Sequence, residues 1–543
     1  MPDKFVTTYD HTVGERLPHF RSLSGIEYKR IYDEKCWNKK LPDAGEYPFT
    51  RGIYKDMYRS RLWTRRQQSG FGTPEESNEL LKFLFKMGQT GINIDSDIAS
   101  KLGLDPDYPL AQADVGLQGT SMCTYEDMTV LFKDIPIDRI STTLIFPPPS
   151  SAVMMAQYLL MAEERGIPAY QLQGTIMNCP FTQLVGPTYQ ANTAFFPIDV
   201  ALEIGLDLVE YLLKVAPRWN VLNVNSRNIR ECGVDAVWEA AFGISLGMDY
   251  VRRLIRRGLH VDSFAQRIGF FCAVHMDLFE EVAKFRAMRR IWARVMKEIF
   301  GAKSEKSMQF RCAVQTSSLT FTAQEPLNNI VRASIQTLAA ILSGVQSIHT
   351  TCYDEAYCLP TEKAQKLALR TQEILAYETG CAKVVDPLGG SYFLEALTDE
   401  LEEKIWELVK DIEKRGGFIE CFKSGFVENV LNEARYRFAE QIESGELPIV
   451  GLNIFRDEEA NTDIEIFTQR PDMQRQRIEY AINYKNKKGR DSAFRALKDL
   501  YLATKRVPRE NLVLPIMEAT RQRATLQEIC DAMRDALGFE IPH

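Results

Sequence analysis

The chain has 543 residues, of which 45% are hydrophobic and 26% are charged, as in ordinary globular proteins. A net charge of -7 over this length does not favour nucleic-acid binding, and no apolar run reaches the roughly 18 residues of a membrane span. The first residues, MPDKFVTTYDHTVGER, lack the basic and apolar order of a signal peptide, so we expect a cytoplasmic protein.

Cysteine and histidine usage argues against a metal centre built from side chains. The eleven cysteines include no C-x-x-C pair, and the six histidines never fall at metal-ligand spacing. We therefore expect reduced, mostly buried thiols and no protein-built metal site.

A helix start is well marked within RRQQSGFGTPEESN (65–78). Thr73 can cap the helix, a proline suits its first position, and Glu76 completes a capping box. The residues before the cap are typical of a loop. The local pattern leaves open whether Gln67 and Gln68 are simply polar or face a substrate.

Eight short strand-like runs alternate with helical segments in the middle of the chain. The runs are GINIDS near 91, ISTTLIF near 140, LQGTI near 172, VLNVNS near 221, RIGFF near 267, MQFRCAVQT near 308, GVQSIHT near 344 and AKVVD near 382. Helical spacing of apolar residues is clear at 151–166, 276–301 and 325–344.

This order of elements predicts an α/β fold, a (β/α)8 TIM barrel over residues 61–420. Residues 1–60, rich in Tyr, Arg and Pro, predict an extended N-terminal arm, and residues 421–543 predict a helical C-terminal region. A doubly wound open sheet is the alternative, although no glycine-rich phosphate fingerprint favours it.

The predicted strands carry polar or small residues where barrel strands normally place Val, Ile and Leu. The period-two positions are Asn93 and Asp95, Asn223 and Asn225, Arg267 and Gly269, and Gln309, Arg311, Ala313 and Gln315. If these side chains face inward, the barrel axis is a polar channel. The alternative is that they face outward or lie at strand ends, where Asn and Gln are common.

Six stretches carry a family resemblance: GEYPFTRGIYKDMYRSRLWTRRQQSGFGTPEESN, DVGLQG, RIGFF, KSMQFRCAVQTSSLTFTAQEPLNNIVR, QSIHTTCYDEA and VVDPLGGSYFLE. Together they resemble the adenosylcobalamin-dependent acyl-CoA mutases of the methylmalonyl-CoA mutase family, from about Gly45 to the C-terminus. The resemblance implies a TIM barrel that threads the pantetheine arm of coenzyme A along its axis. It also implies a radical 1,2-rearrangement of an acyl-CoA thioester, with adenosylcobalamin supplying the radical.

The cobalamin domain of that family carries D-x-H-x-x-G, which this sequence lacks. The nearest match, YDHTVG at 9–14, places Asp10 directly beside His11. The chain therefore resembles the large subunit of a two-subunit mutase. We expect a small cobalamin-binding subunit as partner, an acyl-CoA as substrate and a dimer of heterodimers as the assembly.

The resemblance implies roles for three groups of residues. The CoA-binding positions are Tyr54, Met57, Arg61, Thr64, Arg66, Asn93, Thr143, Thr175, Arg267 and Gly269. The cobalamin-facing positions are Gln118, Glu231, Leu319, Glu355 and Ala356. The positions at the substrate pocket or its supporting network are Gln68, Met177, Glu203, Asn228, Lys306 and Gln315. Arginine suits CoA phosphates because its guanidinium binds oxyanions in pairs, although a single arginine is equally often a solvated surface charge.

The departures from the family pattern fall at the substrate. Gln68 stands where methylmalonyl-CoA mutases have Tyr, Met177 where the family has Gln, and Leu319 where it has a Trp beside the corrin. Asn228 aligns with the family's His that hydrogen-bonds the thioester carbonyl. An Asn can still donate a hydrogen bond, but it cannot transfer a proton. Counted without gaps, Glu203 aligns with the Arg that pairs with the substrate carboxylate.

Three hypotheses follow. If Glu203 faces the pocket, it repels a carboxylate, which predicts a branched, hydroxylated or amino acyl-CoA substrate instead of methylmalonyl-CoA. If the alignment slips by one helical turn, Glu203 lies on a helix surface and methylmalonyl-CoA mutase proper is the alternative. A non-catalytic CoA-binding paralogue is suggested by Asn228, whereas the CoA arginines, the AVQTSS strand and Glu355 argue against it.

Overall fold

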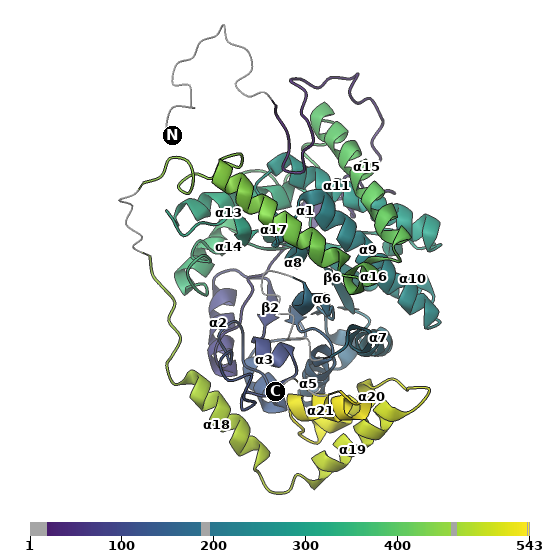
Figure 1. Ribbon diagram of the computed structural model, residues 1–543, viewed down its shortest axis with the longest axis vertical. Helices are drawn as coiled ribbons and strands as arrows, with labels where there is room; N and C mark the ends of the chain where they lie inside the picture. Colours follow the sequence, from purple (N-terminus) through teal and green to yellow (C-terminus); the bar gives the residue numbers. More distant parts are fainter. Residues whose placement is uncertain (1–18, 186–195, 458–463, 540, 542–543) are drawn as a thin grey trace.

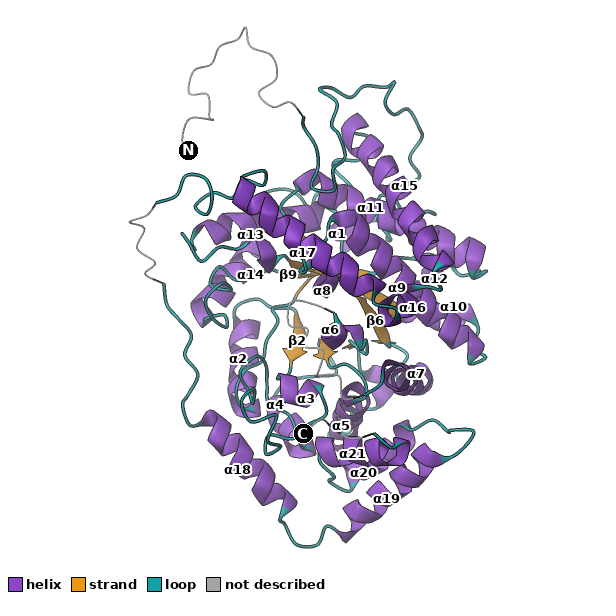
Figure 2. Ribbon diagram, viewed as in Figure 1, coloured by secondary structure: helices purple, strands orange, loops and turns teal. Residues whose placement is uncertain are grey.

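The centre of the molecule consists of parallel strands enclosed by helices (Figures 1 and 2). The computed structural model describes residues 19–185, 196–457, 464–539 and 541. The strands are β1 (Thr64–Arg65), β2 (Gly91–Asp95), β3 (Ser141–Ile145), β4 (Gly174–Ile176), β5 (Trp219–Asn220), β6 (Leu222–Asn225), β7 (Ile268–Val274), β8 (Cys312–Thr316) and β9 (Ser347–His349). They form two parallel sheets, ordered β1-β9-β8-β7-β6 and β2-β3-β4-β5.

Both edges of the second sheet adjoin edges of the first. Ser69, shortly after β1, forms a parallel bridge with Ile94 of β2, and its backbone nitrogen donates to the Asn93 oxygen at 2.9 Å. At the other edge, only Val221 separates β5 from β6, and its nitrogen donates to the Arg267 oxygen at 3.1 Å, just before β7.

Seven of the eight predicted strands are confirmed, from GINIDS to GVQSIHT. The strand prediction for AKVVD (382–386) is wrong. This segment turns instead, because Asp386 has a φ of 49° and accepts hydrogen bonds from Arg286 at 2.6 Å and Arg51 at 3.1 Å. The prediction of a loop from Arg65 to Thr73 is also wrong in part, because Arg65 belongs to β1, which pairs with β9.

The helices lie around the strands (Figure 2). Those up to the fifth strand are α1 (Met57–Ser60), α2 (Pro74–Lys86), α3 (Ile98–Lys101), α4 (Tyr125–Leu131), α5 (Ser150–Glu164), α6 (Phe181–Leu184) and α7 (Ile198–Val215). The following ones are α8 (Arg227–Arg230), α9 (Ala236–Arg256), α10 (Val261–Phe264), α11 (Leu278–Arg294), α12 (Glu305–Met308), α13 (Asn328–Leu342) and α14 (Glu362–Tyr377). The predicted capping box of α2 is confirmed, because Thr73 and Glu76 each accept the other's backbone N–H.

The last part of the chain is helical, and its helices begin before residue 421, where the sequence placed the start of the helical region. Its helices are α15 (Tyr392–Lys414), α16 (Phe418–Lys423), α17 (Phe426–Ser444), α18 (Met473–Lys485), α19 (Asp491–Lys505), α20 (Val513–Arg521) and α21 (Leu526–Leu537). The final helices, drawn yellow in Figure 1, lie against the α5 side of the molecule. Arg477 of α18 holds Asp127 of α4 at 2.9 Å, which fixes this region to the centre.

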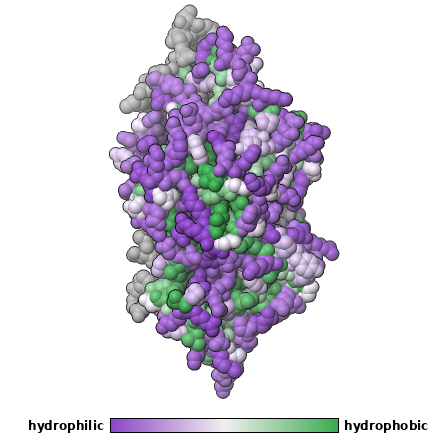
Figure 3. All heavy atoms as spheres, turned by 90° about the vertical axis from the view of Figure 1, so that its right-hand side faces the viewer, coloured by the Kyte–Doolittle hydropathy of each residue, from purple (hydrophilic) through white to green (hydrophobic). Residues whose placement is uncertain are grey.

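The outer helices turn polar faces to solvent. The side shown in Figure 3 is hydrophilic over most of its area, with hydrophobic residues near its middle and in its lower part. Within the described residues, no helix is long and apolar enough to cross a membrane.

The N-terminal arm, from its first described residue at 19, contains no helix before α1 and packs against α11 and α15. The Ser24 backbone nitrogen donates to Glu280 of α11 at 2.9 Å, and Lys39 pairs with Asp399 of α15 at 2.7 Å. Burial raises the pKa of Glu280 to about 7, and the nearby Asp277 raises it further.

Glu280→Gln is expected to flatten the pH dependence of stability. The Glu280 pKa is about 7 in the folded chain and ordinarily 4.5, so its stabilising protonated form is fully present below pH 4.5 and lost as the pH rises through 7. At pH 8 the variant should exceed the parent in unfolding free energy by up to about 3 kcal/mol, whereas the two should agree near pH 4. Urea unfolding at both pH values measures this, and equal stabilities at pH 8 would contradict it.

Candidate functional site

Eight strands or strand ends surround the centre, and each contributes a pair of residues two apart in sequence. One residue of each pair belongs to a first layer of side chains and the other to a second layer. The layer nearer the amino ends is Arg66, Asn93, Thr143, Thr175, Asn223, Gly269, Ala313 and Ser347. The layer nearer the carboxyl ends is Gln68, Asp95, Ile145, Met177, Asn225, Phe271, Gln315 and His349. Because alternate residues of a strand share a face, both layers point to the same central space.

Two cavities occupy that space. The amino-side cavity has a volume of about 380 Å³ and the carboxyl-side cavity about 610 Å³. Met177, Phe271 and His349 line both, so the cavities meet at these three residues. The small side chains of the first layer leave open an axis that a row of Val, Ile and Leu would fill.

Four arginines surround the amino-side cavity, and no carboxylate lines it. They are Arg61, Arg66, Arg218 and Arg311. None of them forms an ion pair with a carboxylate in the part of the chain that the structure describes. Uncompensated guanidinium groups at one opening favour a ligand that carries several negative charges.

Arg66 is the most deeply placed of these arginines. Its guanidinium donates to Thr143 Oγ1 at 2.5 Å, Ser141 Oγ at 2.6 Å and the Ile92 oxygen at 2.9 Å, while its buried Nε has no partner among the described residues. Burial lowers the pKa of Arg66 to about 10, and the adjacent positive charge of Arg61 lowers it further. An anion between the two arginines would relieve that repulsion.

A polar cluster defines one wall of the carboxyl-side cavity. The Gln68 amide donates to one oxygen of Asp95, and Lys101 of α3 pairs with the other at 2.7 Å. All three side chains line the cavity. A hydroxyl or amino group on a ligand would find a carboxylate acceptor here that is already held in place.

Asn228 lies in the same cavity with one of its two amide hydrogens committed. Its Nδ2 donates to the Thr182 backbone oxygen at 2.9 Å, and its backbone nitrogen donates to Asn225 Oδ1 at 3.3 Å. The family resemblance implied that the Asn228 side chain hydrogen-bonds the thioester carbonyl. In the structure, one of its amide hydrogens is bonded to the Thr182 backbone oxygen instead.

Uncommitted polar groups face the rest of the carboxyl-side cavity. The side chains of Gln118, Gln315 and Glu355 make no hydrogen bond within the described residues. Burial raises the pKa of Glu355 to about 7 although Arg227 lowers it. Arg227 itself lines the cavity without an ion pair to any described carboxylate. This donor and acceptor set fits a polar ligand.

Most residues named from the sequence come together at these cavities. The amino-side cavity is lined by Tyr54, Arg61, Thr64, Arg66, Asn93, Thr143, Thr175 and Gly269. The carboxyl-side cavity is lined by Gln68, Gln118, Asn228, Gln315, Glu355 and Ala356, and Met177 lines both. Six predicted site residues line neither cavity: Met57, Arg267, Glu203, Lys306, Glu231 and Leu319.

Four of the residues left out occupy supporting positions. Met57 is buried beneath Gly52 and Gly344, and Arg267 donates to the Ala216 oxygen at 3.1 Å. Glu231 accepts from the Leu319 backbone nitrogen at 3.1 Å, beyond the ends of β6 and β8.

The expectation that Glu203 faces the pocket requires correction. Its carboxylate pairs with Arg257 at 2.5 Å and Arg253 at 3.3 Å on α9, and its side chain is 42% exposed. The gapless count that placed Glu203 began at residues 192–197, and 192–195 lie outside the described residues. An alignment error of one residue in that segment moves every aligned position of α7 by about 100° around the helix axis. Lys306 is likewise exposed on α12, away from both cavities.

Sequence reasoning assigned no role to Lys101, Arg218, Arg227 and His349, which line the cavities. Arg218 precedes β5, while Arg227 and Lys101 follow a strand end by a few residues. His349 belongs to β9 and continues the period-two pattern from Ser347, which was the available signal.

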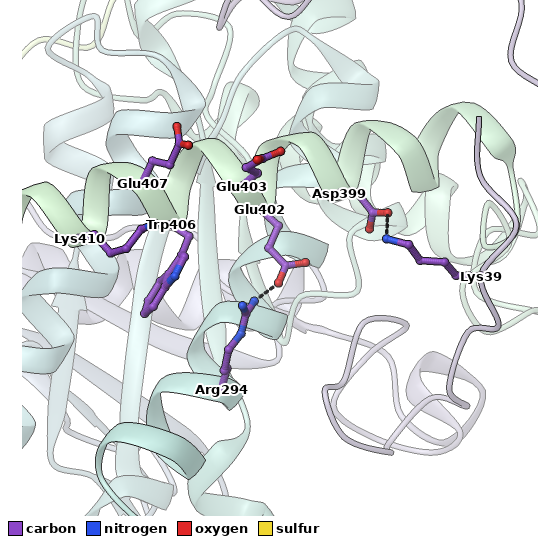
Figure 4. Close-up of a pocket in the computed structure, with 8 residues that line it drawn as sticks. All are labelled: Lys39, Arg294, Asp399, Glu402, Glu403, Trp406, Glu407 and Lys410. Atoms are coloured by element: carbon purple, nitrogen blue, oxygen red, sulfur yellow. Dashed lines mark hydrogen bonds and ion pairs between the residues drawn. The ribbon is translucent and has the colours of Figure 1, made fainter. Parts of the chain in front are cut away.

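A groove of about 410 Å³ lies on the outer surface along α15 (Figure 4). Lys39 pairs with Asp399 at 2.7 Å and Arg294 pairs with Glu402, so much of its charge is internally balanced. Its ion pairs fasten the arm and α11 to α15. In the described ranges, no group of three or more His, Cys, Asp or Glu side chains is arranged to hold a metal ion.

Comparisons with known proteins match nearly the whole chain. The family model described as Methylmalonyl-CoA mutase matches residues 21–539. The 2-hydroxyisobutanoyl-CoA mutase large subunit of Aquincola tertiaricarbonis is 38% identical over 531 residues, covering 96% of this chain and 93% of the relative. Methylmalonyl-CoA mutase of Rhizobium meliloti (strain 1021) is 38% identical over 524 residues, covering 95% and 72%. The mitochondrial methylmalonyl-CoA mutase of Homo sapiens is 35% identical over 518 residues, covering 95% and 68%.

Proposed function

Because the chain belongs to the methylmalonyl-CoA mutase family and is an isomerase, we propose that it is the large, substrate-binding subunit of an adenosylcobalamin-dependent acyl-CoA mutase. The observation that carries this proposal is the pair of side-chain layers around one central space, with arginines at one end and a polar pocket at the other.

The two sheets form one (β/α)8 barrel in this proposal. The parallel bridge from Ser69 to Ile94 and the near-continuity of β5 and β6 support closure at both sheet edges. Eight strand positions then surround the axis, as in a TIM barrel.

Coenzyme A enters from the amino side of that barrel. Its phosphates lie at Arg61, Arg66, Arg218 and Arg311, and its pantetheine arm runs along the small polar residues of the first layer. An extended arm of this kind suits a narrow polar channel, because its amides find Asn and Thr partners such as Asn93 and Thr143. The thioester reaches the junction of the cavities, and the acyl chain lies in the carboxyl-side cavity.

Residues of the carboxyl-side cavity, together with a small cobalamin-binding subunit, would hold adenosylcobalamin. Gln118, Glu355 and Ala356 are the cavity residues of this chain that would face it, with Glu231 and Leu319 behind them. The relative from Aquincola tertiaricarbonis is itself described as a large subunit, which supports a separate small subunit. A dimer of heterodimers is part of the proposal and rests on the family resemblance alone.

The chemistry supplied by bound adenosylcobalamin is homolysis of its cobalt–carbon bond and exchange of one hydrogen with the acyl chain. The residues of this chain orient the acyl group and exclude water from it. Ile145, Met177 and Phe271 form an apolar cluster beside the thioester position, which shields a reactive acyl intermediate from solvent.

The substrate is proposed to be a hydroxylated branched acyl-CoA, and not methylmalonyl-CoA. With Glu203 placed outside the pocket, the support is the Gln68, Asp95 and Lys101 cluster, which offers a fixed carboxylate acceptor to a hydroxyl group. The name of the Aquincola tertiaricarbonis relative points to the same substrate class.

Asp95→Asn is expected to lower kcat/KM for a 2-hydroxyacyl-CoA by about 10- to 100-fold, because a hydrogen bond to a charged acceptor is lost. For the analogue without the hydroxyl group, the change should stay below about threefold. Steady-state kinetics of the assembled enzyme on both substrates measures this split. Equal losses on both substrates would contradict a hydroxyl-binding role.

A second candidate substrate is methylmalonyl-CoA, and the unpaired Arg227 favours it. A guanidinium without a carboxylate partner in the described structure can bind a substrate carboxylate. If this candidate holds, Arg227→Gln removes activity on methylmalonyl-CoA selectively.

The test mixes this chain with a small subunit carrying D-x-H-x-x-G and adenosylcobalamin, then screens acyl-CoA thioesters for isomerisation by mass spectrometry. Preferred turnover of a hydroxylated branched thioester is the expected result. Preferred turnover of methylmalonyl-CoA would select the second candidate. Tight CoA binding without turnover of any thioester would favour a non-catalytic paralogue.

A further inference from the structure

His349 lies where the two cavities meet. It is one of the three residues that line both, and the other two, Met177 and Phe271, have no hydrogen-bond donor in their side chains. In the proposed function, on which this inference rests, the junction receives the thioester of the substrate. His349 is therefore the polar side chain at the position of the carbonyl group.

The hydrogen bonds of His349 determine which nitrogen carries its proton. The backbone N–H of Gln68 donates to Nδ1 at 2.8 Å, so Nδ1 is the acceptor and Nε2 carries the hydrogen. No hydrogen bond of acceptable geometry joins Nε2 to a described residue, and Nε2 is not among the fully buried unpartnered atoms. The backbone of Arg66 also lies beside the ring and partly opposes the lowering of its pKa. Its N–H is thus free to serve a ligand in the cavity.

The other side chains that could donate a hydrogen bond to the carbonyl either already donate to a protein group or line only one of the two cavities. The Gln68 amide donates to Asp95, and the Asn228 amide donates to the Thr182 oxygen. Gln315 is the register neighbour of His349 on β8, but it lines only the carboxyl-side cavity.

We propose that His349 positions the substrate by donating a hydrogen bond from Nε2–H to the thioester carbonyl oxygen. It thereby takes over the contact that the sequence comparison assigned to Asn228. Burial lowers the pKa of His349 to about 3, and Arg227 lowers it further, so the ring stays neutral at physiological pH. The hydrogen bond polarises the carbonyl without transferring a proton, and its strength should not change between pH 5 and pH 9.

The test compares two ligands that differ only at the carbonyl group, acetyl-CoA and S-ethyl-CoA. Isothermal titration of the full chain gives both affinities without the cobalamin cofactor. The wild-type chain should prefer acetyl-CoA by about tenfold at pH 5, 7 and 9, as expected for one hydrogen bond to a neutral donor.

Two substitutions of His349 separate its role as hydrogen-bond donor to the thioester carbonyl from its role as acceptor for the Gln68 N–H. His349→Asn retains an acceptor for the Gln68 N–H but has no donor at the Nε2 position, so the preference should fall below twofold. His349→Gln can place an N–H at that position, so the preference should stay above fivefold. Arg65→Gln, which changes a side chain that lines neither cavity, should leave the preference unchanged. Unmodified CoA should bind all variants alike, because its phosphates lie at the arginines.

The outcomes distinguish this inference from the function on which it rests. A wild-type preference below twofold, with CoA still bound, would overturn the role of His349 but not the proposed function. A preference kept by His349→Asn, or abolished by Arg65→Gln, would also overturn it. If the wild-type chain binds none of the three ligands, the proposed function fails and the inference fails with it.

Discussion

Replacing Arg61 and Arg66 together by glutamine is expected to weaken the binding of CoA by about 100-fold or more. Each guanidinium offers charge-assisted hydrogen bonds to phosphate, and the loss of two such contacts corresponds to at least this factor. The amino-side cavity has no carboxylate in its lining, so no negative charge of the protein competes with the ligand for these arginines. Calorimetric titration with CoA at fixed ionic strength measures the effect.

Arg65→Gln is the matched control, since Arg65 is adjacent in sequence but points away from the cavity. Its Nε donates to the Gly88 oxygen at 3.0 Å. This variant should bind CoA within twofold of the wild type even if it is less stable. A loss below threefold in the double variant would show that the phosphates bind elsewhere.

Lys284→Met is expected to destabilise the folded chain by about 3–5 kcal/mol, because it leaves two buried carboxylates, Glu239 and Glu281, with Arg230 as their one paired cation among the described residues, at 3.7 and 3.5 Å. Lys284 is fully buried and donates to Glu239 of α9 at 2.7 Å and to the Ala273 oxygen of β7 at 2.8 Å. It also pairs with Glu281 on its own helix, α11. Burial alone would lower the pKa of Lys284, but the two glutamates raise it overall. The ammonium group thus joins two helices to a central strand.

Urea unfolding compares Lys284→Met with Lys404→Met, whose lysine is 44% exposed on α15 and pairs only weakly with Glu400 at 3.9 Å. The control should change stability by less than about 0.5 kcal/mol. Adding Glu281→Gln to Lys284→Met should restore part of the loss, because it removes one uncompensated charge. A loss below 1 kcal/mol for Lys284→Met would show that the cluster relaxes or admits water.

The strands could be predicted from sequence where apolar and β-branched residues alternate, which covers β2, β3 and most later strands. β1 could not, because its short run TRRQQ is polar. Arg65 of β1 is buried and Arg66, directly after it, is partly buried, for reasons that only the assembled structure supplies, such as the bonds from Arg66 to Thr143 and Ser141. Conversely, AKVVD has strand-like composition but turns, since the ion pairs of Asp386 act over more than 90 residues of sequence.

The period-two pattern also anticipated the two layers around the axis. Asn93 and Asp95, Asn223 and Asn225, and Ala313 and Gln315 each contribute one residue to either cavity. The pattern does not extend to Arg267 and Gln309, which bond to backbone oxygens outside the lining. Glu203 was misplaced because a sequence count cannot determine the rotation of a helix. The role proposed for His349 depends on its contact with Gln68, which is 281 residues away in sequence.

The central claim is that an acyl-CoA lies along the axis between the two side-chain layers. The most direct measurement is a crystal structure of this chain with an acyl-CoA bound. The expected result is electron density for the pantetheine arm from Arg61 past Asn93 and Thr143, with the thioester beside Met177 and His349. Density for the ligand on the outer surface, for example in the groove along α15, with both cavities filled by water, would contradict it.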